Sequence, residues 1–249
     1  MGSFTFVCAE IPETERQALV DIYNSTGGEN WRNNEGWLGE AGTECEWYGI
    51  ECSYPHNTFV QALRLYFPSP DPPHDIVGNN LTGELPESIQ NLVSLKSLYL
   101  SCNKLTLPPE IGNLYNLEHL EMYDNNLSSI PPEIGNLYNL QWLYLSGNNL
   151  TSVPYEIGSL HNLTSLDLSF NDLTDIPIEI CYMNNLQSLW MDGNKLTSLP
   201  VEIESLSNLQ ALQLMNNDLT SLPKTIGKLN KLNNLLLNDN KLTGLPNEI

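Results

Sequence analysis

The feature that most constrains the fold is an apolar pattern, LxxLxLxxNxL, which recurs from Leu95 onward. Successive asparagines of the pattern are 22 residues apart once and 23 residues apart five times. A fixed period of this length is the signature of stacked structural repeats. The asparagines are Asn103, Asn125, Asn148, Asn171, Asn194, Asn217 and Asn240.

Each repeat predicts one coil of a solenoid. The LxL segment is expected to form a short strand whose two leucines point inward, because a single coil cannot bury its apolar face and must share a core with its neighbours. The asparagine amide is expected to turn inward and pair with backbone groups. A proline and then a glutamate follow in most coils, which suits a short helical or 3₁₀ turn.

The pattern is identified as a leucine-rich repeat. It predicts the α/β class and a right-handed leucine-rich repeat solenoid, or horseshoe. A parallel sheet is expected on the concave face, with short helical or 3₁₀ turns on the convex face.

The division of the chain follows from where the repeat begins. An earlier coil runs from Val60 to Pro86 and carries an insertion at 67–78 with four prolines, expected to be a stiff loop beside the concave rim. We therefore expect eight leucine-rich repeats over residues 59–249. Residues 13–58 are expected to form a helical N-terminal cap, and residues 1–12 to be a remnant of a leader peptide or of a cloning sequence.

The sequence stops without a polar terminal unit after the last repeat, so no C-terminal cap is expected. The leucines of the last coil would then lie open, and either a truncated chain or an end-to-end homodimer is expected. These leucines are Leu232, Leu235 and Leu237.

The segment before the repeats resembles a known cap. The sequence ERQALVDIYNSTGGENW, then GWL, then CEWYGIEC resembles the plant-type cap of extracellular leucine-rich repeat proteins. These include receptor-kinase ectodomains, polygalacturonase-inhibiting proteins and secreted bacterial or protist repeat proteins. The resemblance implies a disulfide between Cys45 and Cys52 and an extracellular or cell-surface location. The later Leu-Thr-Ser-Leu-Pro coils instead resemble intracellular Ras-pathway scaffolds, so a cytoplasmic location is the alternative.

Five asparagines stand in glycosylation sequons, which fit a secreted eukaryotic protein. Four of the five overlap the Asn-Leu-Thr/Ser wording of the repeat itself, so they add little weight. The candidates are Asn24, Asn80, Asn126, Asn149 and Asn162.

Composition excludes several partners. The formal net charge is -20, with 10 Lys and Arg against 30 Asp and Glu, and no Lys or Arg lies between Lys104 and Lys195. Phosphate binding needs clustered cations, so nucleic acid is not expected as a partner. No apolar run is long enough to span a membrane. No cofactor or metal site is expected, since the chain lacks the usual phosphate-loop, zinc-ligand and nucleophile motifs.

The ligand-binding residues are expected among the strand positions that point outward onto the concave face, because the coil does not need them. Aromatic side chains ringed by acids suit a protein or peptide ligand with basic and apolar groups. A glycan stacked on the same rings is the alternative ligand, and cross-strand packing of the rings is the structural alternative. The candidates are Tyr66, Tyr99, Glu121, Tyr123, Asp124, Trp142, Tyr144, Asp167, Trp190 and Asp192.

The sequence therefore predicts a non-catalytic recognition module that works outside the cytoplasm through its concave face. Two other interpretations stay open: an intracellular scaffold for signalling proteins, and a secreted inhibitor or binder of glycan-active enzymes. An enzyme is not expected, because the four histidines have no nucleophile arranged beside them in the sequence pattern.

Overall fold

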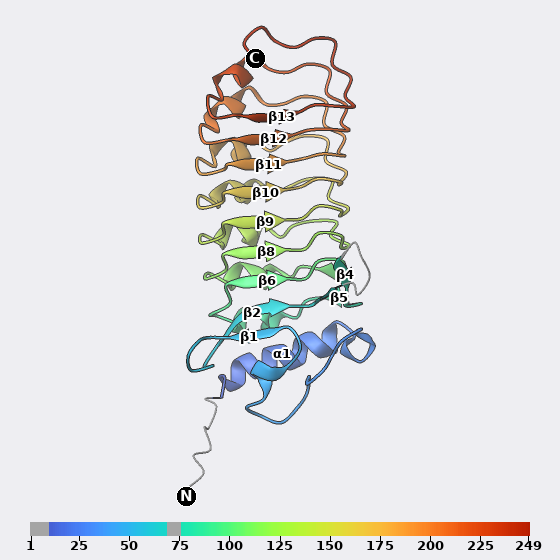
Figure 1. The fold of residues 1–249 in the computed structure, drawn as a ribbon, viewed down its shortest axis with the longest axis vertical. Coiled ribbons are helices and arrows are strands. Elements are labelled where there is room, and N and C mark those ends of the chain that lie inside the picture. Colours follow the sequence, from blue (N-terminus) through green and yellow to red (C-terminus); the bar gives the residue numbers. More distant parts are fainter. Residues whose placement is uncertain (1–9, 69–75) are drawn as a thin grey trace, which may run out of the picture.

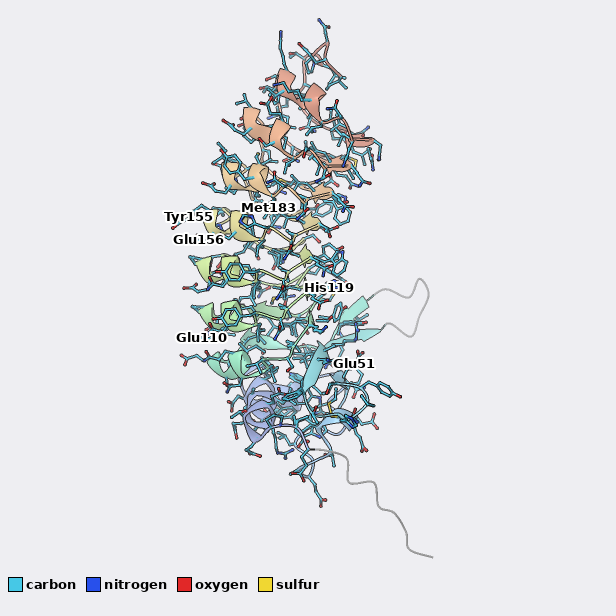
Figure 2. The ribbon with its side chains drawn as sticks, turned by 90° about the vertical axis from the view of Figure 1, so that its left-hand side faces the viewer. Glu51, Glu110, His119, Tyr155, Glu156 and Met183 are labelled. Atoms are coloured by element: carbon cyan, nitrogen blue, oxygen red, sulfur yellow. A yellow bond between two sulfur atoms is a disulfide. The ribbon has the colours of Figure 1, made fainter. Side chains whose placement is uncertain are left out.

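The computed structural model describes residues 10–68 and 76–249. Figure 1 shows a single column of stacked coils, with the N-terminal helix α1 at one end and the C-terminus at the other. The strands lie along one side of the column and the short turns along the opposite side (Figure 2). The chain is thus a leucine-rich repeat solenoid with a mostly parallel main sheet, two two-stranded sheets and one α-helix among its described residues.

The main sheet has nine strands in the order β1-β2-β6-β8-β9-β10-β11-β12-β13. Every pair from β2 to β13 is parallel and keeps the same register, so that Leu98, Leu120 and Leu143 are direct neighbours. The parallel strands are β2 (Val60–Arg64), β6 (Ser97–Tyr99), β8 (His119–Glu121), β9 (Trp142–Tyr144), β10 (Ser165–Asp167), β11 (Ser188–Trp190), β12 (Ala211–Gln213) and β13 (Asn234–Leu236).

A buried asparagine holds each coil to the previous one, as the sequence predicts. The Asn148 amide nitrogen donates to the carbonyls of Met122 at 2.9 Å, Leu145 at 3.0 Å and Ser146 at 3.3 Å. Its amide oxygen accepts from the backbone N–H of Leu127 at 2.9 Å. Asn125, Asn171, Asn194 and Asn217 make the same bonds.

The convex side is built from 3₁₀ turns, each following a proline that serves as its N-cap. The turns stack so closely that a side chain is excluded at some positions: a Cβ on Gly135 would lie 2.6 Å from the Glu156 carbonyl oxygen. The turns are η3 (Glu87–Asn91), η4 (Pro109–Asn113), η5 (Pro132–Asn136), η6 (Tyr155–Ser159), η7 (Ile178–Tyr182), η8 (Val201–Ser205) and η9 (Lys224–Lys228).

The N-terminal segment covers the open end of the first coil. Helix α1 (Glu13–Ser25) lies in the segment expected to form a helical cap, and it buries Ala18, Leu19 and Ile22. Two short turns follow, η1 (Gly28–Asn30) and η2 (Glu44–Glu46), and the rings of Trp31 and Trp37 meet edge to face with centroids 4.8 Å apart. The apolar residues of this segment belong to the same core as the repeats.

The disulfide implied by the family resemblance is present, between Cys45 and Cys52. It closes the segment that leads into β1 (Ile50–Cys52), which pairs antiparallel with β2 at the edge of the main sheet. This edge strand was not predicted from the sequence.

The insertion at 67–78 differs from the stiff loop that we expected. Its two ends form an antiparallel pair, β3 (Tyr66–Pro68) with β4 (Ile76–Gly78), while the part between them lies outside the described residues. Gly78 lies directly on the next coil, where a Cβ would collide with the Cys102 carbonyl oxygen. A second pair, β5 (Thr82–Glu84) with β7 (Lys104–Thr106), joins this coil to the next one.

Replacing a core asparagine tests the ladder. The Asn148→Ala variant leaves three carbonyls and the Leu127 N–H without their buried partner, and we expect the free energy of unfolding to fall by about 3 kcal/mol. The matched variant Asn149→Ala removes an exposed amide and should change stability by less than about 0.5 kcal/mol. Urea unfolding of both variants checks this, and equal losses would contradict the role given to Asn148.

Glu15 gives a pH-dependent test. It is buried, its Oε2 accepts from the Val60 N–H at 2.7 Å, and Oε1 has no hydrogen-bond partner among the described residues. Burial raises the pKa of Glu15, and the Val60 hydrogen bond opposes this only in part. The folded chain therefore holds the proton more tightly than the unfolded chain, and stability is lost as pH rises through the folded pKa.

The Glu15→Gln variant keeps the acceptor for Val60 and carries no charge. We expect the melting temperature of this variant, relative to the unmodified protein, to rise between pH 4 and pH 7. Thermal melts at several pH values measure the difference, and a difference that does not change with pH would contradict the raised pKa.

Candidate functional site

The outward side chains of the sheet form rows, because the constant register places equivalent positions side by side. In the central row Tyr99 neighbours Glu121, which neighbours Tyr144. The row continues through Asp167 to Trp190. It therefore alternates aromatic and acidic residues over five adjacent strands, and we call it the ring–carboxylate row (Tyr99, Glu121, Tyr144, Asp167, Trp190).

A histidine joins the rings at one end of this row. The centroid of His119 lies 4.7 Å from that of Tyr99 and 5.6 Å from that of Tyr144, and Trp142 lies 5.4 Å away on its other side. The His119 Nε2 is 2.8 Å from a Glu121 carboxylate oxygen, and Nδ1 is 3.2 Å from the Tyr99 hydroxyl. The cross-strand packing considered as an alternative is therefore present among these rings.

The packed rings leave part of the row open. A hollow of about 500 Å³ lies over the sheet, lined by Glu121, Tyr123, Tyr144, Ser146, Asp167 and Trp190. The rings of Tyr144 and Trp190 stand 5.9 Å apart, at 37° to each other, on either side of the strand that carries Asp167. Ring faces beside a carboxylate attract a cation.

The electrostatic field in the hollow is negative. Burial raises the pKa of the Tyr144 hydroxyl, the hydrogen bond to Ser165 opposes this, and the charges of Glu121 and Asp167 raise it further. Burial likewise raises the pKa of Tyr123 to about 12, with Cys102 and Glu121 adding to the effect. The carboxylate charges that contribute to these shifts favour a positive group of a ligand.

Arg64 lies at the β2 end of the row. Its guanidinium stands 4.2 Å from the centroid of the Tyr99 ring, and its Nε bonds the Glu51 carboxylate at 2.5 Å. Figure 2 shows Glu51 and His119 on the strand side of the column, opposite Tyr155 and Glu156 on the turns. Sequence reasoning did not select Arg64 or His119, although both stand in outward columns of the predicted strands.

Asp192 has a different place from the other candidates. It is buried, and its Oδ1 accepts from the Met215 N–H at 2.7 Å. With the Gln213 amide oriented to satisfy both of its ends, Gln213 donates to Asp192 Oδ2 at 3.0 Å and accepts from the Trp190 indole N–H at 3.2 Å. Asp192 is thus linked to Trp190 through the Gln213 amide. Burial raises the pKa of the Asp192 carboxyl, and the Met215 hydrogen bond opposes this.

The remaining candidates lie around the row. Trp142 is half-buried beside His119. Tyr66 belongs to β3, outside the main sheet. Asp124 is exposed in a left-handed turn just after β8, close to Gly147 of the next coil.

The five sequon asparagines are all exposed. Two of them are engaged, because the Asn80 amide donates to the Asn30 carbonyl at 2.9 Å and the Asn162 amide to the Tyr138 carbonyl at 2.7 Å. Asn24, Asn126 and Asn149 show no such side-chain bond in the described part of the chain. Of these, Asn126 and Asn149 lie in the repeats.

Over residues 10–68 and 76–249, no group of three histidine, cysteine or acidic residues is arranged to hold a metal ion. Within the same ranges no helix has the length and apolar character needed to cross a bilayer.

Comparisons with known proteins agree with this architecture. Two leucine-rich repeat family models match the chain, one at residues 75–92, 94–114 and 116–137, the other at 138–179 and 161–206. A 121-residue stretch, 47% of the chain and 11% of the relative, is 44% identical to "MDIS1-interacting receptor like kinase 1" of Arabidopsis thaliana. The chain spans about a tenth of the length of the curated relatives it matches.

Solved structures of receptor ectodomains superpose on most of the chain. The complex "PEPR1-AtPEP1" matches with a TM-score of 0.76 and 28% identity, over 93% of this chain and 32% of that one. The Arabidopsis receptor kinase HAESA, solved with the peptide hormone IDA and the co-receptor SERK1, matches with a TM-score of 0.69 and 28% identity, over 95% and 43%.

The stacked coils and their parallel sheet define the class of solenoid repeat proteins. Within that class, the chain belongs to the leucine-rich repeat proteins.

Proposed function

We propose that this chain is a non-catalytic recognition module that binds a peptide or protein ligand on its strand face, outside the cytoplasm. The observation that carries the proposal is the ring–carboxylate row with its hollow between β8 and β11. The coil needs its inward leucines and asparagines but not these outward residues, so large rings there serve another purpose.

The neighbours support the same proposal. The HAESA structure contains a peptide hormone and a co-receptor, and this chain superposes on that ectodomain over 95% of its length. A ligand that pairs with the row presents apolar surface to the rings and a positive charge to Glu121 or Asp167. The described residues offer no nucleophile–base arrangement beside the hollow, which favours binding over turnover.

A peptide-display selection against the immobilised protein tests the site. We expect the selected peptides to lose at least about tenfold in affinity for the Asp167→Asn variant, which removes one charge with little change in shape. The control is Asp175→Asn, an equal charge change at an exposed position of the same coil. Peptides that bind both variants equally well, and also bind Tyr144→Ala as well as the unmodified protein, would contradict a strand-face site.

The proposed location has its own test. Disulfides persist in oxidising compartments, so we expect the natively expressed, unreduced protein to carry the Cys45–Cys52 bond. Mass spectrometry of a digest reads this bond, and reads any sugar on Asn126 or Asn149 in the same run. Two free thiols without sugar would contradict export and favour the intracellular scaffold.

A further inference from the structure

The ring–carboxylate row contains the same local arrangement twice. Glu121 stands between Tyr99 and Tyr144, and Asp167 stands between Tyr144 and Trp190, each on neighbouring parallel strands in register. Each carboxylate therefore has an aromatic ring on both sides. The two carboxylates are two strands apart, which corresponds to about 9.5 Å.

The protein itself shows how a guanidinium uses this surface. Arg64 lies over the face of Tyr99 at 4.2 Å while its Nε pairs with the Glu51 carboxylate. One planar cation thus contacts a ring and a carboxylate at the same time, the arrangement that arginine side chains favour. A ligand arginine can make the same two contacts at Asp167, by lying over the Tyr144 or the Trp190 ring beside the carboxylate.

Glu121 and Asp167 differ in how far neighbouring groups already compensate their charges. Glu121 has the His119 Nε2 at 2.8 Å, and Arg64 covers one ring of its pair. Asp167 accepts one described hydrogen bond, from the Ser169 N–H at 2.9 Å, and forms no ion pair in the described part of the chain. The Asp167 position is therefore the stronger of the two for a cation, and Glu121 is the second.

We propose that the ring–carboxylate row binds an extended peptide that lies across the strands. The peptide has the polyproline II conformation and basic residues at positions i and i+3. This inference rests on the proposed function, because it specifies the ligand of the same strand face. The basic side chains pair with Glu121 and Asp167, and apolar residues of the peptide pack on the rings.

The spacing selects this conformation over others. Polyproline II has three residues per turn and a rise of 3.1 Å per residue, so residues i and i+3 share a face about 9.3 Å apart. In a β-strand the residues on one face are i and i+2, at about 6.7 Å, and i+4, at about 13 Å. Neither value matches two strand spacings, and a helical ligand reaches about 10.5 Å only between i and i+7.

Fluorescein-labelled synthetic peptides test the spacing rule directly. Each has a proline-alanine host and two arginines, placed at i+2, i+3, i+4 or i+7, with a neutral citrulline replacing one arginine in a matched set. We expect the i+3 peptide to bind about fivefold more tightly than the other spacings and than its citrulline analogue, at low salt. Fluorescence anisotropy against the unmodified protein measures the dissociation constants.

Two variants assign the effect to the row. Asp167→Asn should lower the affinity of the i+3 peptide to that of its citrulline analogue, whereas Asp175→Asn should leave it unchanged. Equal affinity for all spacings, no binding of the i+3 peptide, or equal behaviour of the two variants would overturn the proposal. Tightest binding at i+2, i+4 or i+7 would overturn it as well.

The display selection separates this inference from the proposed function. Selected peptides that depend on Asp167 and Tyr144 but carry no basic pair at i and i+3 would overturn the spacing rule and leave strand-face binding standing. Selected peptides that are indifferent to both residues would overturn strand-face binding as well.

Discussion

The buried asparagine amide of each coil is the interaction on which the rest of this structure depends. It donates to carbonyls of its own coil and of the coil before it, and it accepts an N–H from the preceding coil, as at Asn148. Unpaired backbone groups at these bends would be costly because water does not reach them. The amide thus fixes the register between coils together with the strand hydrogen bonds.

Constant register has a functional consequence. Because Leu120, Leu143 and Leu166 are exact neighbours, the residue after each of them is also a neighbour of its counterparts. A continuous row of outward side chains can therefore form, with one residue from each coil, without any change to the core. The alternation of rings and carboxylates along the row is possible only because no strand slips by one position, which would turn the row inward.

The left-handed residue before each asparagine is a second result of the same bend. Asp124, Gly147 and Gly193 fit this conformation, since glycine and aspartate tolerate a positive φ. Phe170 adopts it as well, and its side chain is 61% exposed. A Cβ on Gly193 would lie only 2.5 Å from the Phe170 Cδ1 atom. The Phe170 ring therefore fits at this position because the neighbouring residue of the next coil, Gly193, has no side chain.

Much of the fold could be predicted from the sequence, because the repeat pattern determines the structure of each coil. The inward leucines, the buried asparagines and the turns after proline follow from one period that is read many times. The antiparallel strand β1 could not be predicted in this way, since a segment as short as Ile50–Cys52 has no period and pairs only because β2 presents a free edge. The β3–β4 pair was not predicted either, because the prolines of the insertion favoured a loop although Ile76 and Val77 are typical strand residues.

The candidate site shows the same division at the level of side chains. The period-two rule found the members of the row, since it needs only the strand positions. It could not show that the Asp192 carboxylate accepts a hydrogen bond from the Met215 N–H, because the orientation of that carboxylate depends on the loop after the strand and on Gln213. Nor could it show that His119 binds Glu121, which requires the two rotamers to be known.

The charge distribution favours the middle coils, and not the ends, for the proposed site. The stretch between Lys104 and Lys195 contains no lysine or arginine, so no side-chain cation from these coils, apart from a protonated histidine, neutralises Glu121 and Asp167. Arg64 stands nearest the row, and Glu51 already pairs with it. A positive ligand approaching the sheet therefore meets its least compensated carboxylate at Asp167, where two rings flank it and the hollow opens. In the proposed complex, the uncompensated negative charge of these coils attracts the ligand at a distance, and the rings on their strands bind it by contact.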